Sequence, residues 1–204
     1  MTTLLLIRHG ENDYLKKGIL IGNMPGVHLN ERGHEQAAAI RESLQGQPIK
    51  AIYSSPLERA IETATPLAKT LGLEILVRPA LTDTNVGDWA RKKLKDLRQL
   101  PAWKQVQAKP SEFHFPGGDS FPGLQARLTG EIAAIARTHA KNDLVAVFFH
   151  ADPIKLVVAH YLDLPLDHFQ KLCVETGSVS ILTIHKSDAR LVALNLNPPF
   201  VLNV

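Results

Sequence analysis

The chain of 204 residues has one cysteine, Cys173, and no apolar run close to the length of a membrane span. A lone cysteine excludes an internal disulfide and is typical of a reducing compartment, and we expect Cys173 to be a small buried residue. A spanning helix needs roughly 20 apolar residues, and the apolar run at the N-terminus is too short for the core of a signal peptide. We therefore expect a cytoplasmic protein with no membrane partner.

Long runs of charge of one sign are also absent. The net charge is only +3 and the basic residues are spread along the chain, so no nucleic-acid partner is predicted. No cysteine or histidine cluster has metal-ligand spacing, so we predict no metal ion and no other cofactor. Hydrophobic residues make up 45% of the chain, enough for the core of a single domain over residues 1–204. The sequence leaves the oligomeric state open, a homodimer included.

What the sequence does contain is an alternation of apolar runs and segments with helical spacing. Strands are predicted at residues 3–8, 51–54, 74–78 and 144–149, and a closing hairpin at 178–185 and 190–197 around Lys186-Ser187-Asp188. Helices are predicted to begin at Asn30, Ser55-Pro56, Ser120 and Asp152-Pro153, with Asn30, Ser55 and Asp152 as caps. This order favours an α/β fold whose sheet is mostly parallel, with the hairpin as an antiparallel edge.

Two of the predicted strands end in a histidine, His9 and His150. The carboxyl ends of parallel strands lie at one edge of a sheet, where open α/β sheets bind their ligands. Arg59 falls in the first turn of the helix after Ser55-Pro56, and such a helix start adds backbone N–H groups and a positive dipole end. Together with Arg8 these residues would form a cationic cluster suited to phosphate, which guanidinium groups bind through paired, directional hydrogen bonds. Taken singly, each histidine could be structural and Arg59 could be a solvated helix residue.

These motifs resemble the histidine phosphatase superfamily, which includes the cofactor-dependent phosphoglycerate mutases. The resemblance begins with the signature Arg8-His9-Gly10-Glu11 and continues in the same order along nearly the whole chain. The other matching segments are Leu29-Asn30-Glu31-Arg32-Gly33 with Gln36-Ala37, Tyr53-Ser54-Ser55-Pro56-Leu57-Glu58-Arg59-Ala60 with Thr63-Ala64, Gly87-Asp88-Trp89, Pro116-Gly117-Gly118-Asp119-Ser120 and residues 147–150.

The resemblance implies a three-layer α/β/α sandwich and catalysis through a phosphohistidine intermediate. His9 corresponds to the nucleophile. Arg8, Arg59 and His150 correspond to the phosphate pocket, and His150 is also a catalytic residue because it would donate a hydrogen bond to the transferring oxygens.

The proton donor and the substrate contacts depart from the family's usual pattern. The acid position falls on Asp83, where the family usually has glutamate, and Asp88 is the fallback. We assign Asn12 and Gly22 to substrate binding. Asn12 replaces the usual serine or threonine, and Leu15 stands where many members have asparagine. The other departures are Ala90-Arg91 after Trp89 and Phe149-His150-Ala151 in place of serine-histidine-glycine.

Residues 89–119 are expected to be less regular and to form a cap over the site. They hold many lysines and arginines, which could recognise an acidic substrate or could form a solvated helix face. Both interpretations stay open.

The favoured function is hydrolysis of a small phosphorylated metabolite. The first alternative is a phosphoglycerate-type phosphomutase. Mutases of this family generally carry a longer central insertion and a C-terminal tail, whereas this chain ends at Val204, soon after its predicted hairpin, which favours hydrolysis. The second alternative is a catalytically weak domain that binds phosphorylated ligands. The missing glutamate supports this alternative, and the intact basic cluster weighs against it.

Overall fold

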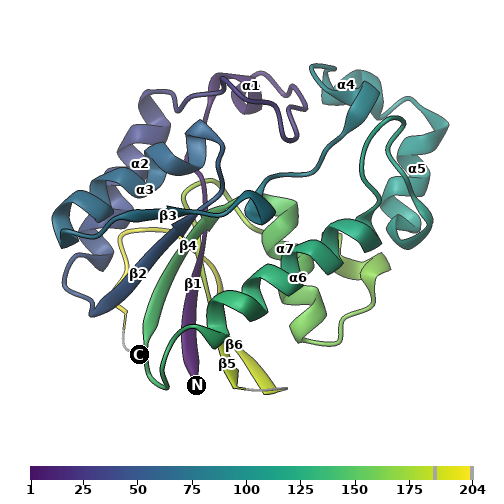
Figure 1. Ribbon diagram of the computed structural model, residues 1–204. Helices are drawn as coiled ribbons and strands as arrows, with labels where there is room; N and C mark the ends of the chain where they lie inside the picture. The colour runs from purple at the N-terminus through teal and green to yellow at the C-terminus, as the bar shows by residue number, and fades with distance from the viewer. Residues whose placement is uncertain (186–187, 203–204) are drawn as a thin grey trace.

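In the computed structural model, which describes residues 1–185 and 188–202, six strands form one sheet in the order β3-β2-β4-β1-β5-β6 (Figure 1). Strands β1 to β4 are parallel, β5 pairs antiparallel with β1, and β6 pairs antiparallel with β5. The predicted parallel sheet with an antiparallel edge is therefore confirmed. In the predicted hairpin turn, Lys186 and Ser187 lie outside the described residues. The strands are β1 (Thr2–Arg8), β2 (Ile49–Ser54), β3 (Ile75–Val77), β4 (Leu144–Phe149), β5 (Val179–His185) and β6 (Asp188–Leu196).

Helices cover both faces of this sheet (Figure 1). Within the described residues no helix combines the length and the apolar character needed to cross a bilayer. The α-helices are α1 (Asp13–Lys16), α2 (Glu31–Leu44), α3 (Glu58–Leu71), α4 (Leu94–Leu97), α5 (Pro101–Ala108), α6 (Phe121–Arg137) and α7 (Ala151–Tyr161). Short 3-10 turns occur at η1 (Pro79–Leu81), η2 (Gly87–Trp89), η3 (Pro110–Glu112) and η4 (Leu166–Lys171).

The alternation of side chains along β1 divides the core into two layers. Leu4 and Leu6 point to the face that packs against α6 and α7. Leu5 and Ile7 point to the opposite face, which packs against α2 and α3. All four side chains are fully buried, and burial of each contributes roughly 1.5–3 kcal/mol. The three-layer α/β/α sandwich follows from this two-sided burial, as predicted.

Of the three predicted capping residues, Asn30 is correct and Ser55 and Asp152 are not. The helix predicted to begin at Ser120 does begin there, and Ser120 is its cap. Asn30 Oδ1 accepts from Gly33 N at 2.9 Å, and Ser120 Oγ accepts from Gly123 N at 3.3 Å. The prediction that Ser55 caps the next helix was wrong, because α3 begins at Glu58 after an extended Leu57. Ser55 Oγ instead accepts from Leu57 N at 3.3 Å and contacts a histidine of the site described below.

The expected cap at Asp152 was also wrong. The extended His150 occupies the N-cap position of α7, and Asp152 lies inside the first turn without a capping bond. The helix can begin before Pro153 because the first turn of a helix has no intrahelical partner for its N–H groups, so the missing N–H of proline costs nothing there. Asp152 is free to accept from Lys155 Nζ at 3.3 Å.

The expectation for Cys173 was wrong as well, since this residue is exposed. It lies between η4 and β5 next to Val174, which is buried. Cysteine is buried more often than most residues, but this is only an average tendency. In a connecting segment it does not determine whether Cys173 or its neighbour Val174 faces inward.

Residues 89–119 contain the short helices α4 and α5, of which α5 lies beside one end of α6 (Figure 1). Backbone hydrogen bonds join this segment to the loop after α1: Leu20 N donates to Lys92 O at 2.9 Å, and Leu94 N donates to Gly18 O at 2.8 Å. The segment is therefore attached to the part of the chain that follows the first strand.

Candidate active site

The two predicted histidines meet at the carboxyl edge of the sheet. His9 follows β1 and His150 follows β4, and these strands are paired in parallel with Arg8 opposite Phe149. The two imidazole rings are 5.2 Å apart between centroids, at an angle of 61° between their planes. Both residues are buried, at 3% and 1% exposure. The topology thus brings together two side chains that are distant in the sequence.

The contacts of His9 determine which of its nitrogens is free. Nδ1 lies 2.7 Å from the carbonyl oxygen of Gly10. A carbonyl can only accept, so Nδ1 carries the proton and Nε2 keeps its lone pair. Burial, together with His150, Arg59 and Arg8, lowers the pKa of His9 well below its ordinary value. The imidazole is therefore neutral at neutral pH, as a nucleophile must be.

The backbone around His9 is held by the third helix. Gly10 N donates to Thr63 Oγ1 at 3.0 Å, and Thr63 Oγ1 donates to Arg59 O at 2.6 Å. Gly10 also touches the start of α2 so closely that a Cβ on it would lie 2.6 Å from the carbonyl oxygen of Gly33. Only glycine allows this close approach. The turn that carries His9 is packed against two helices.

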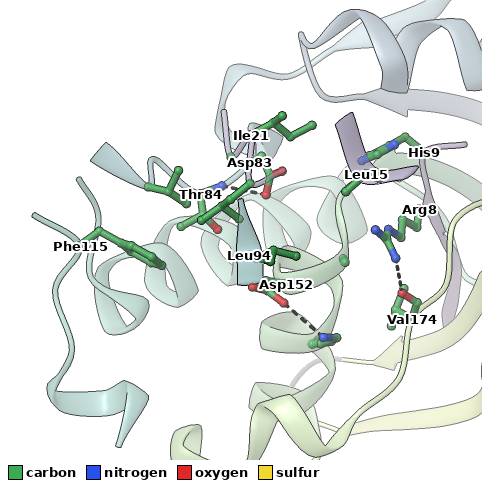
Figure 2. A pocket seen from close by; sticks show the side chains of 15 residues that line it. Arg8, His9, Leu15, Ile21, Asp83, Thr84, Leu94, Phe115, Asp152 and Val174 are labelled. Atoms are coloured by element: carbon green, nitrogen blue, oxygen red, sulfur yellow. Dashed lines mark hydrogen bonds and ion pairs between the residues drawn. The ribbon is translucent and has the colours of Figure 1, made fainter. Parts of the chain in front are cut away.

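Two arginines flank the histidines. The buried Arg59 donates to Met24 O at 3.1 Å and to Gly22 O at 2.7 Å. Arg8 donates to Val174 O at 2.8 Å, as Figure 2 shows. The Nε atoms of both guanidinium groups are buried and have no hydrogen-bond partner in the described part of the chain. Because both groups lie beside the buried histidines, their free N–H donors suit a ligand with acceptor oxygens.

His150 contributes a third unpaired nitrogen. Its Nε2 is 2.8 Å from Ser55 Oγ. Its Nδ1 is buried without a hydrogen bond to any described residue and lies 3.5 Å from Asp83 Oδ2. Burial, followed by the charges of Arg59 and Arg8, lowers the pKa of His150 well below its ordinary value. The imidazole is neutral and can still donate one hydrogen bond.

Asp83 is the carboxylate that lies among these groups. Its Oδ2 is 3.3 Å from an Arg59 nitrogen, and its Oδ1 accepts from Thr84 N at 2.9 Å. Burial raises the pKa of Asp83 in spite of the opposing charge of Arg59. A raised pKa keeps a proton available for transfer. Asp88, the fallback acid, is exposed on η2 and does not line the cavity.

The loop that carries Asp83 is anchored from α6. Arg127 donates to Ala80 O at 2.7 Å and to Thr82 O at 3.1 Å. Asp119 accepts from Asn85 N at 2.8 Å and lies 3.9 Å from an Arg127 nitrogen. These contacts hold the chain on both sides of the acid.

A cavity of about 300 Å³ has Arg8 and His9 at one end and is also lined by Asp83 (Figure 2). Arg59 and His150 lie behind its wall and do not line it. Gly22, which we assigned to substrate binding, also lines the cavity. Asn12 does not, because its Oδ1 accepts from Leu15 N at 3.0 Å at the start of α1. Its Nδ2 is buried without a hydrogen-bond partner among the residues that the structure describes.

Three residues that hold the site together were not identified as site residues from the sequence. Ser55 was assigned to a helix cap, and Thr63 appeared only as part of a motif. Arg127 stands within a regular helical pattern and shows its role only through its contacts with the distant Ala80 and Thr82 carbonyls. The described residues contain no group of three or more His, Cys, Asp or Glu side chains arranged to hold a metal ion.

Known proteins with similar sequence and structure include phosphatases and a mutase. A family model described as histidine phosphatase superfamily (branch 1) matches residues 4–197. Phosphoserine phosphatase 1 of Hydrogenobacter thermophilus is 28% identical over 97% of this chain and 92% of its own. The 2,3-bisphosphoglycerate-dependent phosphoglycerate mutase of Thermoplasma acidophilum is 28% identical over 90% of this chain and 88% of its own. The solved mycobacterial glucosyl-3-phosphoglycerate phosphatase in complex with VO3 has a TM-score of 0.87 at 27% identity, covering 95% of this chain and 98% of that chain.

Proposed function

This chain belongs to the histidine phosphatase superfamily, branch 1, and we propose that it hydrolyses a small phosphorylated metabolite through a phosphohistidine intermediate on His9. The observation that carries this proposal is the set of buried, unpaired nitrogens around the neutral His9, namely Nε of Arg8, Nε of Arg59 and Nδ1 of His150. Three unpaired donors on side chains that lie close to His9 suit the oxygens of a phosphoryl group.

In the first step, Nε2 of His9 attacks phosphorus in line with the ester oxygen. The P–N bond forms, the P–O bond to the leaving group breaks, and Asp83 gives its proton to the departing oxygen. The two guanidinium groups and His150 stabilise the charge on the three equatorial oxygens. Because they are already in place, they do not have to reorganise during the reaction.

In the second step, a water molecule attacks the phosphohistidine. Asp83, now ionised, accepts a proton from this water, the P–N bond breaks, and inorganic phosphate leaves. His9 and Asp83 return to their starting states. The raised pKa of Asp83 supports this exchange of roles, because it brings the carboxyl closer to the pH at which it must both give and take a proton.

The remaining assignments belong to the same proposal. Gly22 contacts the substrate as part of the cavity wall. Asn12 is fully buried and does not line the cavity, so it acts on the substrate only indirectly, through the start of α1, where its Oδ1 accepts from Leu15 N. Residues 89–119 form a cap within a single domain, and their attachment to the loop after α1 supports this interpretation. A cytoplasmic location agrees with the single cysteine.

A phosphomutase is the second candidate, because a mutase is among the similar proteins. Incubation with 3-phosphoglycerate and a 2,3-bisphosphoglycerate primer separates the two. A phosphatase releases inorganic phosphate, whereas a mutase forms 2-phosphoglycerate without net loss of organic phosphate. A panel of phosphorylated metabolites, read out as phosphate release, tests hydrolysis itself. Binding of phosphate esters with no turnover of any of them would instead support a phospho-ligand-binding domain.

A further inference from the structure

A second cavity adjoins the catalytic one on the side away from His9. It has a volume of about 230 Å³ and shares five lining residues with the catalytic cavity, namely Leu20, Leu94, Phe115, Asp152 and Lys155. Figure 2 shows Phe115 at the opposite end of the catalytic cavity from Arg8 and His9. A ligand that extends beyond its phosphoryl group would therefore run toward this second space.

The second cavity has aromatic walls, and we call it the aromatic cavity. Trp89 and Trp103 line it with nearly parallel rings, 6.1 Å apart at 19°. Phe115 stands edge-on to Trp89 at 5.4 Å and 88°. An apolar cavity of about 150 Å³ is large enough for benzene, so this space can hold an aromatic ring. Aromatic walls favour a planar apolar guest, which can stack on one ring and meet the edge of another.

The only charged residues shared by the two cavities in the described chain form an ion pair with each other. Lys155 Nζ lies 3.3 Å from Asp152 Oδ1, and the side chains are 18% and 41% exposed. The pair has no net charge, so it does not attract a second ionic group on the substrate. A charged group placed here would meet one charge of its own sign as well as apolar walls, so it would recover only part of the hydration that it loses.

We propose that the substrate is a phosphate monoester with an uncharged aromatic body, which occupies the aromatic cavity while its phosphoryl group lies at His9. This inference rests on the proposed phosphatase activity and deepens it. The free energy of binding comes from two separate parts of the site: the basic cluster binds the phosphoryl group, and the aromatic cavity binds the ring.

Binding can be followed without any substitution. The chain has two tryptophans, and both line the aromatic cavity. We expect 3-phenylpropylphosphonate, a non-hydrolysable analogue of 2-phenylethyl phosphate, to inhibit competitively and to change the tryptophan emission in a saturable way. Propylphosphonate should leave the emission unchanged. An aromatic phosphonate that fails to bind, or binds with no change in emission, would overturn the proposal.

Turnover of matched esters gives a second test. Ethyl phosphate, 2-phenylethyl phosphate and O-phosphoserine are all esters of primary alcohols, so the leaving groups differ little. We expect kcat/KM for 2-phenylethyl phosphate to exceed the other two values by about 10- to 100-fold, which is the effect of burying one phenyl ring. Equal values, or a preference for O-phosphoserine, would contradict an uncharged aromatic body.

Substitutions at Trp103 connect this preference to the aromatic cavity. Trp103→Ala should lower the ratio of kcat/KM between 2-phenylethyl and ethyl phosphate by about tenfold, and Trp103→Phe should retain most of it. Phe200→Ala is the matched control, because Phe200 packs against the opposite face of the sheet. A ratio that Trp103→Ala leaves at the wild-type value refutes the assignment.

Failure of this inference and failure of the proposed function are distinguishable. Hydrolysis of both alkyl phosphates at the same rate, abolished by His9→Ala, would leave the phosphatase assignment intact and refute the aromatic site. Binding of the aromatic phosphonate with no hydrolysis of any ester would support the aromatic site and refute the phosphatase assignment.

Discussion

The imidazole rings of His9 and His150 stand edge to face at the ends of two adjacent parallel strands, with centroids 5.2 Å apart. Each ring has a pKa well below its ordinary value, chiefly because it is buried and also because Arg59 and Arg8 lie close by; His150 lowers the pKa of His9 further. The two neutral rings then have different tasks. The Gly10 carbonyl leaves His9 with a free lone pair, whereas Ser55 leaves His150 with an unpaired Nδ1 that faces Asp83.

The role of His9 is tested by its removal. We expect His9→Ala to lower the rate of p-nitrophenyl phosphate hydrolysis by more than about 10³-fold, because the P–N bond can no longer form. The wild type should give an acid-labile phosphoprotein in rapid-quench experiments, and the variant should not. His34→Ala, at an exposed position on α2, is the control and should keep the wild-type rate. Equal rates in His9→Ala and wild type would exclude His9 as nucleophile.

The role of Asp83 depends on the leaving group. Asp83→Asn should slow alkyl phosphates by about 10²-fold or more, since a poor leaving group needs the proton that Asp83 supplies. Nitrophenyl phosphate, whose leaving group needs little protonation, should lose much less. The measurement is kcat against leaving-group pKa. Asp88→Asn, at an exposed position, should leave this dependence as in the wild type. If Asp88→Asn steepened it instead, the acid would be Asp88.

Arg127 is expected to act through the loop of Asp83. Arg127→Ala removes the hydrogen bonds to Ala80 O and Thr82 O, so it should lower the free energy of unfolding by about 1–3 kcal/mol. It should also slow alkyl phosphates more than nitrophenyl phosphate, because the displaced acid matters most for poor leaving groups. Arg137→Ala, at an exposed position of the same helix, should change neither property. A loss of stability with no change in leaving-group dependence would limit Arg127 to a structural role.

Stability should decrease as the pH falls from 7 to 5. His9 and His150 have lowered pKa values in the folded state, so the unfolded chain binds more protons below its own histidine pKa, near 6.5. Each such histidine then lowers the free energy of unfolding by up to about 1.4 kcal/mol for each pH unit of acidification. Their contribution to stability is complete above that pH and is lost as the pH falls through the folded-state pKa.

The slope of urea-unfolding free energy against pH measures this effect. It should be smaller in His150→Gln than in the wild type, and unchanged in His34→Gln. Asp83 has the opposite sign, because its raised pKa favours the folded state at low pH and this contribution is lost as the pH rises through the folded-state pKa. The comparison of His150→Gln with the wild type isolates the contribution of His150, because Asp83 is present in both proteins. An equal slope in His150→Gln and wild type would show that His150 does not titrate differently on folding.

The sheet and the basic cluster were predictable because they follow from local patterns and one topological rule. The apolar runs at residues 3–8 and 144–149 indicated buried strands, and parallel pairing then placed His9 and His150 at one edge. Residue type alone could not show that Ser55 and Asp152 do not cap the helices that follow them. Both residues have short polar side chains that suit a cap, but Ser55 contacts His150 and Asp152 pairs with Lys155.

The aromatic cavity was hidden for a similar reason. Trp89, Trp103 and Phe115 lie in the least regular part of the sequence, where no period indicates which side chains share a space. Contacts between residues far apart in the chain, such as those of Arg127 with the loop of Asp83, likewise depend on how α6 crosses the sheet. Neither strand nor helix periodicity contains that information.

The exposed thiol of Cys173 offers a practical means of identifying the ligand. It is the single cysteine of the chain, and it adjoins Val174, whose carbonyl holds Arg8 at the catalytic cavity. A maleimide fluorophore would therefore attach at one position only, next to the end of the cavity that holds Arg8 and His9. The fluorescence of protein labelled in this way could then be used to screen unlabelled phosphate esters for binding. Such a screen would also detect compounds that bind without being turned over.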